Sequence, residues 1–507
     1  MENRIFLSDL KHKEKLHPYW KEGIGGGQVH LLLRESVRNH LKDCLSNCCS
    51  FKYLRCHEMF SDVMAVYRED SNGNPIYDWQ YLDDAYDFLM ETGIKPFVSF
   101  TYMPEALAAK KGYYSGYAKF NASPPKDYNL WSILVEKFVK HCIKRYGLKE
   151  VLQWYFEAWN EPDLMFGNPW DVGYWAGSIE DFFKLYEVMS RTLKKINPNF
   201  KVGGPATSVF NDYNEPGKMK PPYLEEFIKY CYENNVPLDY VSSHPYPTNF
   251  PNNQVDGYDL NFKWREDNAL KLDATYIKNL VVNSPFPDIE IHLNEWSSTP
   301  GQKDKIHDSV FMAPFIIKNM LECQNIVTSS AFWLFTDIFE EDIKGNSVFS
   351  GGYGLVNAQG LRKPSFHAYK FLNMLGNLII EQTNNYIITK KEDNSVQILL
   401  WNYSGFKNYN NDKEDVGLGN SIEYLLEIKD ASRFKSMLIY SLDKSNGSVK
   451  DAWIEIGCPE TPTIDEIKIL KKMAEPRMDI EKIDQNHLIK KFSLQKDGVK
   501  FIELLTK

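Results

Sequence analysis

The sequence lacks long apolar runs. No stretch of about 18 consecutive apolar residues, the length that crosses a bilayer, occurs among its 507 residues. The first residues, 1–9 (MENRIFLSD), contain neither an apolar segment nor a small-residue cleavage site, so we expect no signal peptide. From these two absences we predict a protein that does not span a membrane.

An excess of basic residues is also missing. Lys and Arg total 59 against 68 Asp and Glu, which gives a net charge of −9. Nucleic-acid binding depends on clustered cations that neutralise phosphates, and an anionic membrane surface attracts the same residues. We therefore expect neither nucleic acid nor a membrane among the partners.

The eight cysteines form no paired C-x-x-C framework. Four cysteines lie close to His57 in the sequence: Cys44, Cys48, Cys49 and Cys56. Their spacing does not fit a zinc knuckle. We expect reduced core thiols and no metal site. Free thiols without a signal peptide favour a cytoplasmic location.

A glycine-rich segment at 23–28 (GIGGGQ) resembles a phosphate-binding loop. It lacks a third glycine at the required place, and no convincing strand precedes it. We expect a tight turn at the end of a short first strand, and no cofactor.

Aromatic residues, in contrast, are abundant, at 14% with 12 Trp and 30 Tyr. Sugars commonly stack on such rings, although most of these side chains would fill a large core. A chain of 507 residues exceeds one ordinary core, so two domains are expected.

Residues 16–377 alternate between strand and helix patterns, which predicts an α/β fold, a (β/α)8 TIM barrel. After the short first strand, the expected strands are 51–57, 95–100, 151–158, 201–204, 239–243, 289–294 and 330–335. The expected helices are 28–46, 78–91, 130–145, 179–195, 223–234, 270–282, 308–322 and 365–375.

Residues 378–507 have a different pattern, in which short stretches alternate apolar and polar positions between Asn, Asp, Gly and Lys clusters. This pattern predicts a C-terminal antiparallel β-sandwich. Its expected strands are 378–389, 396–401, 421–428, 436–441 and 492–504, with one helix at 464–474. A strand from residues 1–15 could join the sandwich at its edge.

Two glutamates follow expected barrel strands. Pro162 cannot donate to a strand ladder, so the strand at 151–158 must stop and leave Glu161 near its C-terminal tip. Glu295 follows the seventh strand in the same way. Barrel enzymes place their chemistry at this face, and acetal hydrolysis needs two carboxyl groups flanking the scissile bond. Asn160 could bind the sugar 2-hydroxyl, and Trp333 could wall the pocket.

A set of segments in this order resembles glycoside hydrolase family 39, the β-xylosidases. The family belongs to a clan of retaining glycosidases with Asn-Glu at strand four and Glu at strand seven. The resemblance covers nearly the whole barrel and rests on residues 51–57, 93–97, 124–128, 154–162, 183–187, 201–206, 233–237 and 332–341.

The resemblance implies Glu161 as acid/base and Glu295 as nucleophile. It also implies a glycone subsite lined by His57, Asn160, His244, Tyr246, Trp333 and Glu341. The implied activity is release of β-linked xylose from the non-reducing ends of xylo-oligosaccharides by double displacement. Relatives are often tetramers, so a homo-oligomer is expected.

Two residues depart from the family pattern: Glu58 stands where Gly usually follows the His, and Asn294 where Thr usually precedes the nucleophile. An α-L-iduronidase-like or other family 39 glycosidase is an alternative, but its carboxylate substrate would be repelled by Glu58 and Glu341. A non-catalytic sugar-binding protein is a third possibility, and it would be expected to have lost one of the two glutamates.

Overall fold

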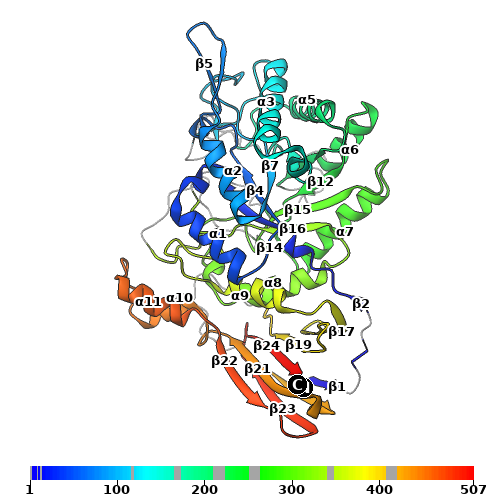
Figure 1. The fold of residues 1–507 in the computed structure, drawn as a ribbon, viewed down its shortest axis with the longest axis vertical. Helices are drawn as coiled ribbons and strands as arrows, with labels where there is room; N and C mark the ends of the chain where they lie inside the picture. Colours follow the sequence, from blue (N-terminus) through cyan, green and yellow to red (C-terminus); the bar gives the residue numbers. More distant parts are fainter. Residues whose placement is uncertain are drawn as a thin grey trace.

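The computed structural model describes residues 3–7, 10–11, 14–115, 119–164, 173–208, 223–249, 263–339, 347–406 and 420–506. It contains a large barrel domain and, below it in Figure 1, a smaller domain of β-sheets. Both ends of the chain lie in the smaller domain in Figure 1. Within the described residues, no helix is both long and apolar enough to cross a membrane.

Eight parallel strands close into a barrel, which confirms the predicted fold. In chain order, which is also their order around the barrel, they are β3 (Gly23–Gln28), β4 (Tyr53–His57), β7 (Lys95–Ser99), β10 (Tyr155–Glu157), β11 (Lys201–Thr207), β12 (Tyr240–Ser243), β15 (Glu290–Trp296) and β16 (Ser329–Phe332). Glu161 therefore follows the fourth strand and Glu295 lies in the seventh.

Helices surround this barrel and bury their apolar faces against it. They are α1 (Glu35–Asn47), α2 (Gln80–Thr92), α3 (Tyr128–Tyr146), α5 (Ile179–Ile196), α6 (Tyr223–Glu233), α7 (Ala269–Val282), α8 (Met312–Glu322) and α9 (Pro364–Met374). Local sequence fixes several of their starts. Ser178 and Asp181 form a capping box at α5, and the Asp127 side chain accepts from two backbone N–H groups at α3.

The glycine-rich segment is a barrel strand, not the turn predicted from sequence. β3 contains all the glycines of 23–28, and a Cβ at Gly25 would lie 2.6 Å from the Trp333 ring. Glycine is therefore required because the residues at the end of β16 pack closely against this strand, and not because the chain turns here. The helix expected at 28–46 is also divided, into a 3-10 turn (Val29–Leu33) and α1.

The fourth strand is shorter than predicted. Residues 148–151 form the short helix α4 (Leu148–Val151), and β10 covers only Tyr155–Glu157. The residues on both sides of the strand are apolar and aromatic. A buried helical turn and a buried strand have the same composition, so the sequence did not distinguish them.

Two loops at the C-terminal face of the barrel contain small hairpins. One holds β8 (Tyr114–Ser115) and β9 (Phe120–Asn121), and the other holds β13 (Thr248–Asn249) and β14 (Lys263–Trp264). A third hairpin, β5 (Tyr67–Glu69) with β6 (Pro75–Tyr77), projects at the top of Figure 1.

The smaller domain contains two separate sheets, as the sandwich prediction requires. The first has the order β2 (Glu14–Lys15), β17 (Leu378–Gln382), β18 (Tyr386–Lys390), β19 (Val396–Trp401), β24 (Val499–Thr506), β21 (Phe434–Leu442) and β22 (Arg477–Lys482). The second has the order β1 (Asn3–Leu7), β20 (Ile422–Lys429) and β23 (His487–Leu494).

Strand boundaries in this domain differ from the prediction. The stretches 378–389 and 492–504 are each parts of two strands, and β22, which alternates apolar and charged residues, was not predicted. β1 pairs parallel with β20, and two helices, α10 (Val449–Glu455) and α11 (Ile464–Met473), project at the left of Figure 1. The domain limits of 16–377 and 378–507 stay a proposal.

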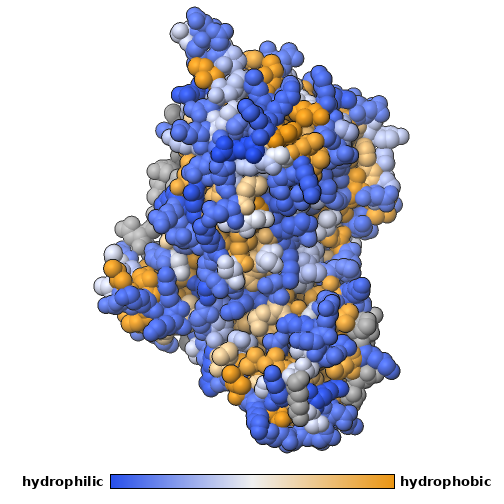
Figure 2. All heavy atoms as spheres, viewed as in Figure 1, coloured by the Kyte–Doolittle hydropathy of each residue, from blue (hydrophilic) through white to orange (hydrophobic). Residues whose placement is uncertain are grey.

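One face of the seven-stranded sheet joins the apolar core of the barrel, while the two sheets enclose a separate core between them. Phe371 of α9 stacks on Phe501 of β24 with ring centroids 5.6 Å apart, and Trp401 of β19 belongs to the same buried cluster. The face of the molecule in Figure 2 is mainly hydrophilic, with hydrophobic patches on both the barrel domain and the sheet domain.

Candidate active site

Two buried carboxylates, Glu161 and Glu295, face each other at the C-terminal end of the barrel. Glu161 lies in the turn after β10, with a left-handed φ of 47°, and its backbone N–H donates to the Ala206 carbonyl at 2.9 Å. Glu295 projects from β15. Each residue is 7% exposed. The backbone bond to β11 therefore fixes a conformation that residues other than glycine rarely adopt.

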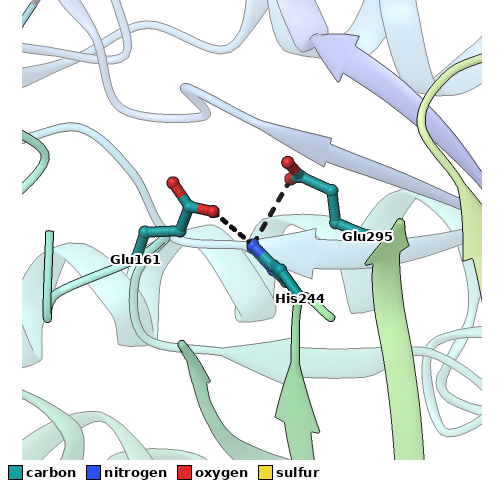
Figure 3. A group of neighbouring side chains, drawn as sticks. All are labelled: Glu161, His244 and Glu295. Atoms are coloured by element: carbon teal, nitrogen blue, oxygen red, sulfur yellow. Dashed lines mark hydrogen bonds and ion pairs between the residues drawn. The ribbon is translucent and has the colours of Figure 1, made fainter. Parts of the chain in front are cut away.

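His244 lies between the two carboxylates, as Figure 3 shows. Its Nδ1 is 2.8 Å from Glu161 Oε1 and 3.6 Å from Glu295 Oε2. One oxygen of each glutamate and a ring nitrogen of His244 all lie within 4.8 Å of one another. The segments that follow strands β10 and β12, together with strand β15, thus bring two carboxylates and one imidazole together.

Hydrogen-bond donors surround Glu295. Tyr246 donates its hydroxyl to Oε1 at 2.7 Å, and Arg55 donates to Oε2 at 3.3 Å. Burial raises the pKa of Glu295 above its ordinary value, while the charge of Arg55 and the hydroxyl of Tyr246 oppose this rise. Burial also keeps the pKa of Tyr246 well above 10, so its hydroxyl remains a donor.

Arg55 connects the site to the interior of the barrel. Its guanidinium donates to Glu157 Oε1 at 2.7 Å and to Asn160 Oδ1 at 2.8 Å, and the residue is 1% exposed. Burial lowers the pKa of Arg55, but the negative charges of Glu157 and Glu295 raise it by more. The pKa therefore lies above its ordinary value, and the guanidinium stays charged. Asn294 donates to the other oxygen of Glu157 at 2.7 Å. A chain of hydrogen bonds through Glu157 and Arg55 therefore links Asn294 to Glu295.

The sequence analysis assigned no function to Arg55 or Glu157, although both lie in segments that resemble the family, 51–57 and 154–162. The signal was present, because each is a charged residue in the middle of an expected buried strand. Such residues are almost never buried without a partner of opposite charge. A search for charges inside barrel strands would have paired them.

The charge state of His244 follows from its surroundings. Burial lowers its pKa well below 6.5, and the positive charges of Arg55 and His57 lower it further. A neutral His244 can accept a hydrogen bond from a protonated Glu161, or donate to an ionised one, through the same Nδ1.

The predicted aromatic wall is present beside these groups. His57, at the end of β4, stacks on Trp333 with centroids 5.3 Å apart, and Phe339 meets the Trp333 ring edge-on at 5.6 Å. The structure thus brings together His57, Asn160, Glu161, His244, Tyr246, Glu295 and Trp333. Glu341 lies outside the described residues.

Glu161, His244 and Glu295 are also spaced so that they could approach a metal ion together. The guanidinium of Arg55, 3.3 Å from Glu295, places a fixed positive charge beside these ligand atoms. A second cation there would be repelled, so this donor set fits proton transfer and carbohydrate chemistry better than metal binding.

Comparisons with known proteins agree with this geometry. The model of the glycosyl hydrolases family 39 matches residues 3–487. A β-xylosidase of Geobacillus stearothermophilus is 32% identical over 92% of this chain and 88% of its own length. A β-xylosidase of Caldicellulosiruptor saccharolyticus is 31% identical over 93% of this chain and 91% of its own.

A solved structure of a monomeric β-xylosidase from Caulobacter crescentus superposes with a TM-score of 0.86 at 26% identity, covering 99% of both chains. The sequence match and the shared fold extend over the barrel and the sheets alike. The chain therefore belongs to the glycosyl hydrolases of family 39.

Proposed function

We propose that the protein is a retaining β-xylosidase that releases single xylose units from the non-reducing ends of xylo-oligosaccharides. The observation that supports this most directly is the close approach of Glu161 and Glu295, whose oxygens lie within 4.8 Å. Retaining glycosidases keep their carboxyl groups about 5–5.5 Å apart, whereas inverting enzymes need about 6.5–9.5 Å to admit water.

We assign Glu295 as the nucleophile and Glu161 as the acid/base. Arg55 and Tyr246 stabilise the ionised form of Glu295, which attacks the anomeric carbon. Glu161 gives its proton to the leaving oxygen, and repulsion between two close carboxylates favours one proton in the pair. Once Glu295 is glycosylated its charge is gone, and Glu161 can then accept a proton from the attacking water.

Azide tests these roles. Glu295→Ala should abolish turnover of every glycoside, whereas Glu161→Ala should lose least on substrates with good leaving groups. With an activated substrate, azide should accelerate Glu161→Ala and give the β-glycosyl azide, whereas Glu295→Ala should give the α-azide. The opposite anomers would mean that the roles are exchanged. An inverted sugar from the wild-type enzyme would contradict the retaining mechanism.

Two loops of the barrel support cleavage at the ends of the oligosaccharide, not within it. The β8–β9 and β13–β14 hairpins belong to long loops at the mouth of the barrel, which can close the site into a pocket. We expect xylobiose to be cleaved faster than internal bonds of polymeric xylan. Faster cleavage of the polymer, measured as loss of viscosity, would contradict this.

The substrate can be separated from its alternatives with a panel of nitrophenyl glycosides. An iduronidase-like enzyme would need a cation for the uronate carboxylate, yet Arg55 is already bound by Glu157, Asn160 and Glu295. We expect the β-D-xyloside to be preferred over the α-L-iduronide. Absence of hydrolysis across the panel would favour a non-catalytic sugar-binding protein.

We further propose a homo-oligomer and a cytoplasmic location. Met478 and Ile480 are 52% and 64% exposed on β22, an edge strand of the seven-stranded sheet, where Figure 2 shows hydrophobic side chains. All eight cysteines are free, and seven are buried, which suits a reducing compartment. Light scattering should give a mass above that of one chain, and a monomer would contradict the oligomer.

A further inference from the structure

Glu58 occupies a position that is costly for a glutamate. It follows His57 directly at the end of β4, has a left-handed φ of 69° and is fully buried. Its backbone N–H donates to Thr101 Oγ1 at 2.6 Å, which holds the conformation. Glycine adopts this backbone region freely, whereas a residue with a Cβ is strained in it.

The carboxylate of Glu58 adds a second cost. Its Oε1 lies 3.4 Å from His57 Nδ1 and its Oε2 lies 3.5 Å from His30 Nδ1. These are ion-pair distances without hydrogen-bond geometry, and neither oxygen has a hydrogen-bond partner among the residues that the structure describes. A buried carboxylate lacking hydrogen bonds is expensive. Strain and an unsatisfied charge at one residue indicate a functional requirement.

That requirement follows from the neighbour of Glu58. The His57 ring is stacked on Trp333 and interacts electrostatically with Glu295. When the Nδ1–H of a neutral imidazole points to a carboxylate, Nε2 is left as the acceptor. A small closure of the 3.4 Å gap would fix this tautomer of His57.

We propose that Glu58 is a positioning residue for His57: it fixes the imidazole so that Nε2 accepts a hydrogen bond from a hydroxyl of a neutral pyranose in the glycone subsite. The proposal rests on the proposed function, since it concerns the same subsite. It assigns a role to a residue with a strained backbone and a buried carboxylate, and it explains what that glutamate does in return for the lost stability.

The test compares Glu58→Gly with Glu58→Gln, each in the presence and absence of His57→Ala, on 4-nitrophenyl β-D-xylopyranoside. Glu58→Gly should lower kcat/KM by roughly 10- to 100-fold, the value of one hydrogen bond to a charged group. Glu58→Gln keeps an acceptor oxygen, so it should lose less. In the His57→Ala background, Glu58→Gly should have little further effect, because the two residues act through one contact.

Thermal unfolding provides the second measurement. Glu58→Gly removes both the strained φ and the buried charge, so its Tm should be equal to or higher than that of the wild type. A matched control is Asn235→Gly, which relieves a left-handed φ of 52° at an exposed residue. It should raise Tm slightly and leave kcat/KM unchanged.

Three outcomes would overturn the proposal: wild-type kcat/KM in Glu58→Gly, an undiminished effect of Glu58→Gly in the His57→Ala background, or a loss of activity accompanied by a lower Tm. Each of these outcomes is measured against a wild-type enzyme that is active. A wild type inactive on every glycoside would instead contradict the proposed function itself.

Discussion

Arg55 and Glu157 form the central buried ion pair of the barrel, and the candidate site depends on it. Arg55 contacts Glu157, Asn160 and Glu295 at once, and Asn294 contacts the far oxygen of Glu157. A lysine could not reproduce these contacts, because only a guanidinium offers several donors in one plane. The pair therefore sets both the orientation of Asn160 and the charge around Glu295.

Glu157→Gln should destabilise the protein and reduce activity together. The change leaves Arg55 with the more distant Glu295 as its carboxylate partner, and breaking a buried ion pair costs about 3–5 kcal/mol. Denaturant unfolding should show this loss, and kcat should fall because Arg55 shifts. The control Asp87→Asn breaks an exposed contact with Arg145, which should cost under about 1 kcal/mol. Equal effects of the two changes would contradict the prediction.

Tyr246→Phe should move the acidic limb of the pH profile of kcat/KM to higher pH. The Tyr246 hydroxyl lowers the pKa of Glu295, so its removal raises that pKa. Because the nucleophile must be ionised, activity should then be lost at a higher pH, by about one unit. Tyr53→Phe, whose hydroxyl donates to the Gln153 carbonyl away from the site, should leave the limb in place. A shift to lower pH would contradict the assignment of Glu295.

At the scale of elements, strand β3 controls the position of Trp333. Gly25→Ala would place a Cβ 2.6 Å from the Trp333 ring and 2.9 Å from the Phe332 carbonyl, so Trp333 must shift. We expect a stability loss of about 1–3 kcal/mol and a higher KM. Gly23→Ala in the same strand meets only a 3.3 Å contact with Ala331 Cβ and should be milder. If Gly23→Ala were the more harmful change, the proposed role of β3 would be wrong.

The segment after β16 is anchored by a buried lysine. Lys363 Nζ lies 2.8 Å from Asp308 Oδ1 and 3.1 Å from Asp337 Oδ1, and it donates to the Gly352 carbonyl at 2.6 Å. Burial lowers the pKa of Lys363, but the two carboxylates raise it above its ordinary value. The ammonium thus stays charged and ties α9 to the segment that includes Trp333 and Phe339.

Lys363→Met should therefore cost about 3–5 kcal/mol of unfolding free energy, because two buried carboxylates lose their cation. The exposed variant Lys229→Met, which loses an (i, i+4) pair with Glu233, should cost under about 1 kcal/mol. Both can be measured by denaturant unfolding. A Lys363→Met protein as stable as the wild type would show that the cluster does not support the segment.

At the scale of the whole molecule, the barrel and the sheet domain fold as partners. β2 pairs with β17, and Phe371 packs against Phe501 within one continuous core. Deleting residues 378–507 would expose this apolar surface. We expect the shortened chain to be insoluble, as judged by the soluble fraction after expression. A soluble barrel with full activity would contradict this, and deletion of residues 1–7 alone, which removes only β1, should be tolerated better.

The sequence by itself determined the alternation of strands and helices, the change of pattern after residue 377, and the two glutamates near the C-terminal ends of strands four and seven. These features are local, since they depend on periodicity, on Pro162 and on the order of short motifs. What only the tertiary structure decided was which distant residues meet. Arg55 and Glu157 are 102 positions apart, and the spacing of Glu161 from Glu295 depends on barrel closure. Likewise, the glycines of β3 are explained by the Trp333 ring, which lies beside them only once strands one and eight are paired.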